Sequence, residues 1–307
     1  CVSSLLSNGA LAFIAYRFVQ LLYRLLYPYY LGTPVDLQKK AGGKWAVVTG
    51  ATDGIGKAYA FELAARSFNV LLVSRTQTKL DETKKEILEK HPKVEIQTFA
   101  FDFSARDDSA YQPLVDVISK LEVGVLVNNV GMSFEYPDTF HEWEGGVKRL
   151  TDVTAINTIP TVLLCAAVLP SMAARRSGVI VNLSSGAGYN IMPFWSVYSA
   201  SKRFVLHLSE ILDAEYASKG VTIQAICPML VATKMSKIRR TSFFGPDATR
   251  FVQAAIKTIG LIQQTTGYFS HQLQAELMGL LPDALVTKII ASHSLAVRTA
   301  ALKKLAK

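Results

Sequence analysis

Short apolar runs alternate with longer segments of mixed polar and apolar residues through the middle of the chain. The runs are rich in valine, isoleucine and leucine, which favour strands that are buried on both faces. They occupy 45–49, 70–74, 94–101, 124–128, 179–183 and 221–227. The intervening segments have helical character, most clearly at 55–65, 78–90 and 199–218. This α/β alternation predicts a doubly wound parallel sheet with helices on both faces.

A separate hydrophobic segment precedes this pattern. Residues 5–31 are mostly apolar and would reach about 40 Å as a helix, which exceeds a bilayer core of about 30 Å. Arg17, Gln20 and Arg24 follow a helical spacing and form one polar stripe, and five tyrosines resemble an interfacial belt. We expect a membrane-anchor helix that either spans the bilayer or lies in its interface. A helix packed on the folded domain is the alternative.

Composition and charge exclude several classes of protein. Half of the residues are hydrophobic and only 19% are charged, so a disordered chain is excluded. The net charge of +9 resides in residues 1–44 and 288–307, and the remainder is balanced. A nucleic-acid partner is not predicted, because a domain that binds one normally carries the basic residues itself. Basic ends suit anionic membrane lipid, with improved solubility as the alternative. The scattered cysteines and histidines predict neither a disulfide framework nor a metal site.

The chain therefore divides into three predicted parts. Residues 1–43 form the membrane anchor and a linker, in which Pro34 and the glycines at 42–43 mark the linker. Residues 44–270 form the α/β domain, and residues 271–307 form a basic helical extension. Within this extension, 273–292 could touch the membrane or form a dimer surface.

The first turn of the α/β domain has the glycine spacing of a phosphate-binding loop. It reads Thr-Gly-Ala-Thr-Asp-Gly-Ile-Gly, directly after a predicted strand and at the start of a predicted helix. Gly50 would permit the tight turn, Gly54 a close approach to a pyrophosphate, and Gly56 the packing of helix against sheet. The helix N-terminus would then face the phosphates. The motif predicts dinucleotide binding of the Rossmann type, and a glycine-rich turn without a ligand is the alternative.

The end of the second predicted strand bears on the choice of dinucleotide. NAD-binding domains usually place an acidic residue there, which binds the ribose hydroxyls. This chain has Ser74, Arg75 and Thr76 instead. Arg75 can pair with a 2′-phosphate through charge-assisted hydrogen bonds. The sequence therefore favours NADPH, with a surface arginine as the alternative reading of Arg75.

Tyr198 and Lys202 are candidate catalytic residues. They are four positions apart in a predicted helix and therefore share one face. Free tyrosine has a pKa near 10, which a neighbouring ammonium group would lower. The phenol could then exchange a proton with a carbonyl or alcohol oxygen. Ser185 precedes Tyr198 by 13 residues and could bind the same oxygen. Taken alone, a tyrosine–lysine pair is often only a solvated helix face.

Together these motifs resemble the short-chain dehydrogenase/reductase family. The resemblance rests on Ser185 and Tyr198-x-x-x-Lys202 together with the G-x-x-x-G-x-G turn. It is supported by the run Asn128-Asn129-Val130-Gly131, in which valine replaces the family's alanine, and by Pro228 and Thr233 after the sixth strand. The resemblance covers about residues 44–270 and implies a Rossmann-type domain. It implies four catalytic residues, in which Lys202 also binds the nicotinamide ribose and Asn157 positions a proton-relay water. The implied catalytic residues are Ser185, Tyr198, Lys202 and Asn157. The implied cofactor-binding residues are Gly50, Thr52, Asp53, Gly54, Ile55, Gly56, Arg75, Asp102 (at the adenine), Asn129, Val130, Gly131, Tyr198, Lys202, Pro228, Val231 and Thr233.

Four segments narrow the resemblance to one membrane-bound subgroup. TGATDGIGK, VNNVGM, VATKM and IRRTSFFGP are similar to the very-long-chain 3-oxoacyl-CoA reductases and the related 17β-hydroxysteroid dehydrogenases. This similarity implies NADPH-dependent reduction of a 3-oxoacyl-CoA during fatty-acid elongation. It also implies the endoplasmic reticulum membrane, a catalytic domain facing the cytosol, other elongase subunits as partners, and a homodimer.

The sequence leaves three functions open. These are the acyl-CoA reductase, a keto-steroid reductase, and a catalytically idle membrane scaffold or NADPH sensor. The complete catalytic set argues against the idle protein. Apolar residues after the sixth strand would either line an acyl channel or pack in the core, namely Met229, Met235, Phe243 and Phe244.

Overall fold

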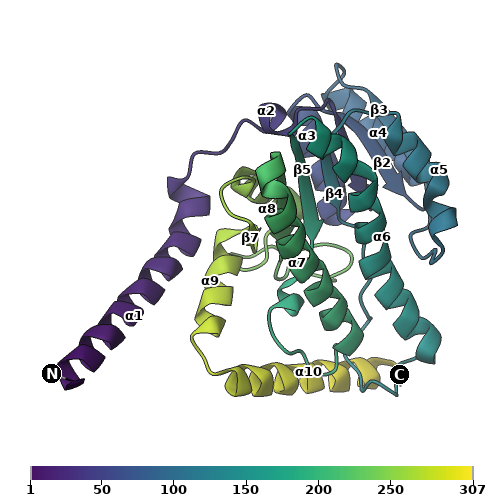
Figure 1. Cartoon of the computed structure of the whole chain (residues 1–307). Coiled ribbons are helices and arrows are strands. Elements are labelled where there is room, and N and C mark those ends of the chain that lie inside the picture. The colour runs from purple at the N-terminus through teal and green to yellow at the C-terminus, as the bar shows by residue number, and fades with distance from the viewer. Residues whose placement is uncertain (1, 239, 306–307) are drawn as a thin grey trace.

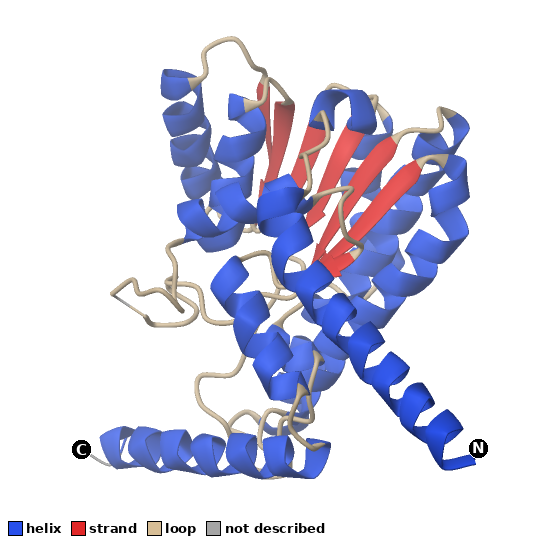
Figure 2. Cartoon of the chain, turned by 90° about the vertical axis from the view of Figure 1, so that its left-hand side faces the viewer, coloured by secondary structure: helices blue, strands red, loops and turns tan. Residues whose placement is uncertain are grey.

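The computed structural model describes residues 2–238 and 240–305. It contains a seven-stranded sheet in the order β3-β2-β1-β4-β5-β6-β7, and every strand pair is parallel (Figure 2). The strands are β1 (Trp45–Thr49), β2 (Asn69–Ser74), β3 (Ile96–Ala100), β4 (Val123–Asn128), β5 (Gly178–Leu183), β6 (Val221–Ile226) and β7 (Gln264–Thr265). The predicted fold class is confirmed, and each of the six predicted strands is present. The short β7 was not predicted.

Helices cover both faces of the sheet because the strands bury alternate side chains on each. Ala46 and Val48 of β1 pack in one core, and Val47 packs in the other. The first core is covered by α3 (Gly54–Ala65), α4 (Gln77–Lys90) and α8 (Ala248–Ala255). The second core is covered by α5 (Asp108–Ser119), α6 (Gly146–Ala174) and α7 (Ser196–Tyr216).

The strand order places the functional crevice. The chain extends outward from β1 through β2 to β3, then returns to add β4 on the other side of β1. In such open sheets, ligands bind beyond the carboxyl ends of the strands where the order reverses. Here that point lies between β1 and β4, so Thr49 and Asn128 mark its floor.

The segment expected to be a linker is packed on the domain. It contains a π-helical turn, η1 (Tyr27–Leu31), and a short helix, α2 (Leu37–Ala41). Leu37 and Ala41 are buried in the first core, and the Tyr29 hydroxyl lies 2.6 Å from the Thr265 hydroxyl. Residues 27–41 therefore belong structurally with the α/β domain rather than to a free tether.

Helix α1 (Val2–Leu26) projects from the β7 edge of the domain (Figure 1). The apolar stretch Asn8–Leu31, which includes most of α1 and continues through η1, is long enough to cross a membrane, and its most apolar part is unburied. Gly146–Ala174 passes the same length and composition test, but this helix is α6, whose side chains fill the second core. Length and exposure therefore single out α1 as the candidate anchor.

The C-terminal region forms two helices. Helix α9 (Phe269–Gly279) starts against the sheet, and α10 (Asp283–Leu305) crosses the base of the molecule. In both views α10 lies at the same end of the molecule as the N-terminus of α1 (Figures 1 and 2). Arg298 of α10 pairs with Asp138 at 2.6 Å and with Glu142 at 2.9 Å. One charge of the basic C-terminus is thus neutralised by the α/β domain.

Candidate active site

A hydroxyl group joins the two strand ends that form the floor of the crevice. The Oγ1 atom of Thr49 accepts hydrogen bonds from the backbone N–H of Asn129 at 2.9 Å and of Val130 at 3.0 Å. In return, the Asn129 amide donates to the Thr49 carbonyl at 2.9 Å. These bonds hold the predicted Asn-Asn-Val-Gly run beside the glycine turn.

The glycine turn has a shape that side chains would destroy. Gly50 and Gly54 have positive φ angles of 64° and 52°, a conformation that favours glycine. A Cβ atom on Gly56 would lie 2.3 Å from the Gly50 carbonyl oxygen. The first N–H groups of a helix have no partner inside it, and Asp53 caps only the N–H of Gly54, at 2.8 Å. The amides of Ile55 and Gly56 are therefore placed to bind phosphate oxygens.

The predicted cofactor residues line the rim of this turn. Thr52 contacts the Ser74 hydroxyl at 3.0 Å, which brings the exposed Arg75 beside the turn. A Cβ atom on Gly54 would lie 3.3 Å from the methyl group of Thr233, so the loop after β6 covers the turn. Among the described residues, no ion pair involves Arg75, and its charge is available to a ligand.

Two predicted cofactor residues have structural partners of their own. The Asp53 carboxylate caps α3 and pairs with Lys234 at 3.0 Å. The Asp102 carboxylate accepts a hydrogen bond from the N–H of Ser104 at 3.0 Å and so shapes the turn after β3. Both side chains therefore hold the backbone beside the glycine turn in place: Asp53 at the start of α3 and Asp102 in the turn after β3.

Asn157 of α6 lies inside the site and connects the segment after β4 with α7. Its amide group exchanges hydrogen bonds with the backbone of Met132, at 2.8 and 2.9 Å, and donates to the Ser201 hydroxyl at 3.0 Å. A Cβ atom on Gly131 would lie 3.0 Å from Asn157 Oδ1 and 3.2 Å from Lys202 Nζ. Gly131 therefore permits the close approach of these two side chains.

Ser185 and Tyr198 face each other across the same region. The Ser185 side chain is near enough to the phenol to lower the pKa of Tyr198, and its hydroxyl accepts a hydrogen bond from the N–H of Ala187 at 3.1 Å. Lys202 is buried, and its amino group donates to the Leu183 carbonyl at 3.0 Å. The structure thus brings together all four residues that were predicted to be catalytic.

The acid–base properties of this group differ from the sequence expectation in one respect. We expected the Lys202 ammonium group to lower the pKa of Tyr198. Burial instead raises the pKa of Tyr198, and the neighbouring Ser185 side chain opposes that rise. Burial also lowers the pKa of Lys202 to about 8. The expected lowering was wrong because desolvation, which sequence spacing does not reveal, is the largest influence on the pKa of Tyr198.

Residues after β6 tie this loop to the catalytic segment. The Pro228 carbonyl accepts a hydrogen bond from the N–H of Gly186 at 2.8 Å, one residue after Ser185. Val231 is buried, and its carbonyl accepts a hydrogen bond from Ser236 at 2.6 Å. The predicted cofactor residues of this loop therefore lie next to both the glycine turn and Ser185.

Apolar side chains surround the phenol. Phe134 and Trp143 stack at 3.7 Å between ring centroids, and their cluster contacts Trp195 and Tyr198. For the apolar residues after β6, the sequence left two alternatives open: they line an acyl channel or they pack in the core. Met235 and Phe243 are each 60% exposed, so core packing is wrong for them. They form an apolar surface on the loop after β6.

Sequence reasoning missed several polar residues that hold the site. Thr49 and Ser201 were not selected, although Thr49 begins the glycine motif and Ser201 lies within the Tyr-x-x-x-Lys segment. Ser184 was also missed, and its hydroxyl donates to the Lys202 carbonyl at 2.6 Å. All three are small hydroxyl residues beside recognised motif positions, and that adjacency was the available signal.

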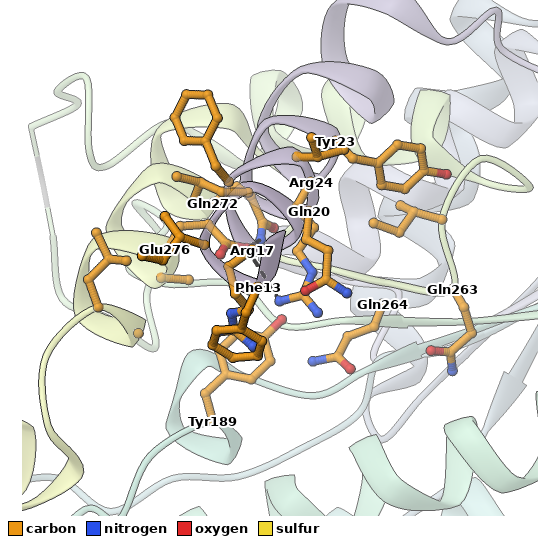
Figure 3. Close-up of a pocket in the computed structure, with 18 of the residues that line it drawn as sticks. Phe13, Arg17, Gln20, Tyr23, Arg24, Tyr189, Gln263, Gln264, Gln272 and Glu276 are labelled. Carbon is orange, nitrogen blue, oxygen red and sulfur yellow. Dashed lines mark hydrogen bonds and ion pairs between the residues drawn. The ribbon is translucent and has the colours of Figure 1, made fainter. Parts of the chain in front are cut away.

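A cavity of about 990 Å³ lies outside this site, between α1 and α9. Figure 3 shows Arg17, Gln20 and Arg24 of α1 among the residues that line it, together with Gln264 and Gln272. Arg24 lies 3.8 Å from Glu276. The predicted polar stripe of α1 therefore faces a cavity, and most of the remaining lining is apolar.

The geometry defines a class of protein. A glycine cradle that a Cβ would fill, free amides at a helix N-terminus and an exposed arginine at its rim fit a phosphorylated dinucleotide. A tyrosine, serine and lysine beside that cradle suit proton transfer to a carbonyl oxygen. This combination is that of a dinucleotide-dependent oxidoreductase.

Comparisons with known proteins agree with this class. A family model described as short chain dehydrogenase matches residues 44–242. The chain is 57% identical over 295 residues to the very-long-chain 3-oxoacyl-CoA reductase let-767 of Caenorhabditis elegans, spanning 96% of this chain and 93% of that protein. It is 48% identical over 291 residues to putative steroid dehydrogenase 1 of the same species, spanning 95% and 93%.

A solved structure extends the comparison to three dimensions. The short-chain dehydrogenase from Sphingobium yanoikuyae in complex with NADPH is 28% identical, with a TM-score of 0.61. The match covers 69% of this chain and 82% of that one. The present protein belongs to the short-chain dehydrogenase family.

Proposed function

We propose that this protein uses NADPH to reduce very-long-chain 3-oxoacyl-CoA to 3-hydroxyacyl-CoA in fatty-acid elongation. The observation that carries the proposal is the convergence of Ser185, Tyr198 and Lys202 beside the glycine cradle. The substrate class is supported by the 57% identity to a reductase of that name. An idle scaffold is disfavoured because it has no need of a complete proton-transfer group.

The residues divide the chemistry between them. NADPH, when bound, supplies the hydride. Tyr198 donates its phenolic proton to the ketone oxygen, and Ser185 holds that oxygen by a hydrogen bond. Burial raises the pKa of Tyr198 and so keeps the phenol protonated at neutral pH, which is the form that reduction requires. Hydrogen bonds hold the two remaining residues in place beside Tyr198 and Ser185. Lys202 is held by the Leu183 carbonyl, and Asn157 is held by Met132 and Ser201.

A keto-steroid reductase is the second candidate, supported by the 48% identity to a putative steroid dehydrogenase. The apolar wall formed by Phe134, Trp143 and Trp195 suits either substrate. NADPH oxidation by the detergent-solubilised full chain, measured with a long 3-oxoacyl-CoA and with a 17-keto-steroid, separates the two. We expect a much higher kcat/KM for the acyl-CoA. Faster turnover of the steroid would overturn the acyl-CoA assignment.

Arg75 is proposed to select NADPH over NADH. Changing Arg75 to aspartate should weaken NADPH binding by at least about tenfold, because one ionic contact to the 2′-phosphate is lost and a repulsion is added. NADH binding should be unchanged or tighter. Fluorescence titration with both dinucleotides measures this, with Arg106→Asp as a control at an arginine that already pairs with Asp152. Unchanged NADPH affinity of the Arg75 variant would refute the assignment.

We propose that α1 anchors the protein in the endoplasmic reticulum membrane, with the catalytic domain in the cytosol. The exposed apolar surface of α1 supports the anchor. The cavity between α1 and α9 supports a bound anionic lipid, because Arg17 and Arg24 face it beside apolar side chains. Exposed Leu277 of α9 and Leu280, directly after this helix, add to this surface.

Other partners belong to the same proposal. The remaining elongase subunits would share this membrane and the acyl-CoA intermediates. A homodimer is supported by apolar side chains left exposed on α6 and α7, namely Val162, Phe204 and Ile211. Light scattering of the detergent-solubilised chain tests the dimer.

Removal of the anchor should separate membrane binding from the fold. Deleting residues 1–22 should leave NADPH binding intact and weaken membrane association, measured by carbonate extraction and dinucleotide titration. Deleting residues 1–40 should also destabilise the domain, because the buried Pro28 and Leu37 and the hydrogen-bonded Tyr29 are lost. If the full chain washes off membranes at high pH, α1 is not an integral anchor.

A further inference from the structure

The loop that connects β6 to α8 contacts both the glycine turn and the segment that follows Ser185. Pro228, Val231 and Thr233 lie at its first end, beside the glycine turn and Gly186. Phe243 and Phe244 lie near its other end and are exposed. The loop spans residues 227–247. Contacts at both of its ends are needed to hold these side chains in one conformation.

His271, in the first turn of α9, contacts both ends of this loop. Its Nδ1 atom accepts a hydrogen bond from the N–H of Met229 at 3.3 Å. Its Nε2 atom lies 3.2 Å from the Phe244 carbonyl oxygen and donates to it. The neighbouring Ser270 hydroxyl donates to the Phe243 carbonyl at 2.6 Å. Residues 15 positions apart in the chain are thereby held by one imidazole ring.

The surroundings of His271 fix its ring and its protonation state. The side chain is fully buried and lies against the rings of Phe251, at 5.9 Å, and Tyr268, at 5.5 Å. Burial lowers the pKa of His271 to about 4. The ring is therefore neutral near pH 7, with its proton on Nε2, as one accepted and one donated hydrogen bond require.

The same helical turn is attached to the sheet on its other side. Gln272 accepts hydrogen bonds from the N–H of Thr266 at 3.0 Å and from its hydroxyl at 3.1 Å. It also donates to Glu276 at 2.8 Å. The turn that holds the loop is thus itself held by the segment that follows β7.

We propose that His271 is a positioning residue that clasps the two ends of the β6–α8 loop and so sets the place of the bound substrate. Met229 explains why this affects the reaction. A Cβ atom on Gly186 would lie 2.3 Å from the Met229 sulfur, so the Met229 side chain packs directly against Gly186, the residue after Ser185. A displaced Met229 would therefore shift the surface against which the ketone is bound.

The test is a set of substitutions in the full-length, detergent-solubilised protein. His271→Phe keeps the ring volume and removes both hydrogen bonds, whereas His271→Gln retains one donor and one acceptor. We expect His271→Phe to raise the substrate KM by about ten- to hundredfold with a smaller change in kcat, because the loss is one of positioning. His271→Gln should recover part of this loss, and Ser270→Ala should have a smaller effect of the same kind.

A second measurement does not depend on the substrate. The loop contains Lys234, Lys237 and Arg240, which trypsin cleaves when the backbone is accessible. Limited proteolysis should cut the His271→Phe protein within this loop several times faster than the wild type. This arm stands apart from the proposed function, on which the KM arm rests, so the failure of either can be recognised.

Gln224→Met is the matched control for general destabilisation. Gln224 is buried in β6 and hydrogen-bonds with Thr258 and Ile262, away from the loop. The clasp is supported if His271→Phe changes KM and loop cleavage and Gln224→Met of similar melting temperature does not. It is overturned if the two variants behave alike, or if His271→Phe leaves both readouts at wild-type values.

Discussion

Tyr198→Phe should lower kcat by roughly 10²–10⁴-fold, the usual contribution of a positioned proton donor. The phenol is the acidic group beside Ser185, and phenylalanine removes its hydroxyl without changing the ring. The ring should keep its place against Trp195, at 6.4 Å between centroids, so folding and NADPH affinity should be preserved. Steady-state kinetics, circular dichroism and dinucleotide titration measure these three properties.

Tyr111→Phe provides the matched control for Tyr198→Phe. Tyr111 is buried, and its hydroxyl donates only long hydrogen bonds, of 3.4 Å, to the carbonyls of Phe103 and Ala105. Its loss should leave kcat within a few-fold of the wild type. A Tyr198→Phe protein that retains more than a tenth of wild-type kcat would show that another group donates the proton.

The sheet was predictable because its strands are buried on both faces. The predominantly apolar sequences of β4 and β5 carry this information, because all of their residues are buried. The strand β7 contains only Gln264 and Thr265 and has no such pattern. It exists because Ala225 and Cys227 donate backbone hydrogen bonds to Gln263 and Thr265. Tertiary pairing, which leaves no local signal, defines this strand.

The recognised motifs located the site because each has a fixed place relative to a strand end. The glycine turn follows β1, and the Asn-Asn-Val-Gly run follows β4, so parallel strands bring them together. His271 has no such relation to a motif, and it was one of several scattered histidines. Its role depends on α9 returning to β6, a contact between segments about 40 residues apart.

The pKa of Lys202 could not be inferred from spacing either. A Tyr-x-x-x-Lys pair gives two side chains on one helix face but does not say how deeply they are buried. In the folded protein Lys202 is 5% exposed, below the end of β5. Burial disfavours its charged form and lowers its pKa to about 8. The residue therefore opposes folding at neutral pH while serving the site.

Lys202→Met should accordingly stabilise the ligand-free protein and abolish turnover. A pKa of about 8 in the folded state, against 10.5 in the unfolded chain, corresponds to about 3 kcal/mol of destabilisation below pH 8. Methionine removes this cost but leaves the Leu183 carbonyl without its 3.0 Å partner, a loss of about 1 kcal/mol. The free energy of unfolding should rise by about 1–2 kcal/mol at pH 7.

The pH dependence of this gain identifies its cause. Between pH 8 and 10.5 the unfolded chain binds the Lys202 proton and the folded protein does not, so wild-type stability recovers as the pH rises. The gain from Lys202→Met should therefore shrink across that interval, whereas Lys93→Met at an exposed site should show no such trend. Urea unfolding at a series of pH values measures both variants. A Lys202→Met protein that is less stable than the wild type at pH 7 would mean that the amino group supports the fold, and the assignment of burial as its dominant effect would be wrong.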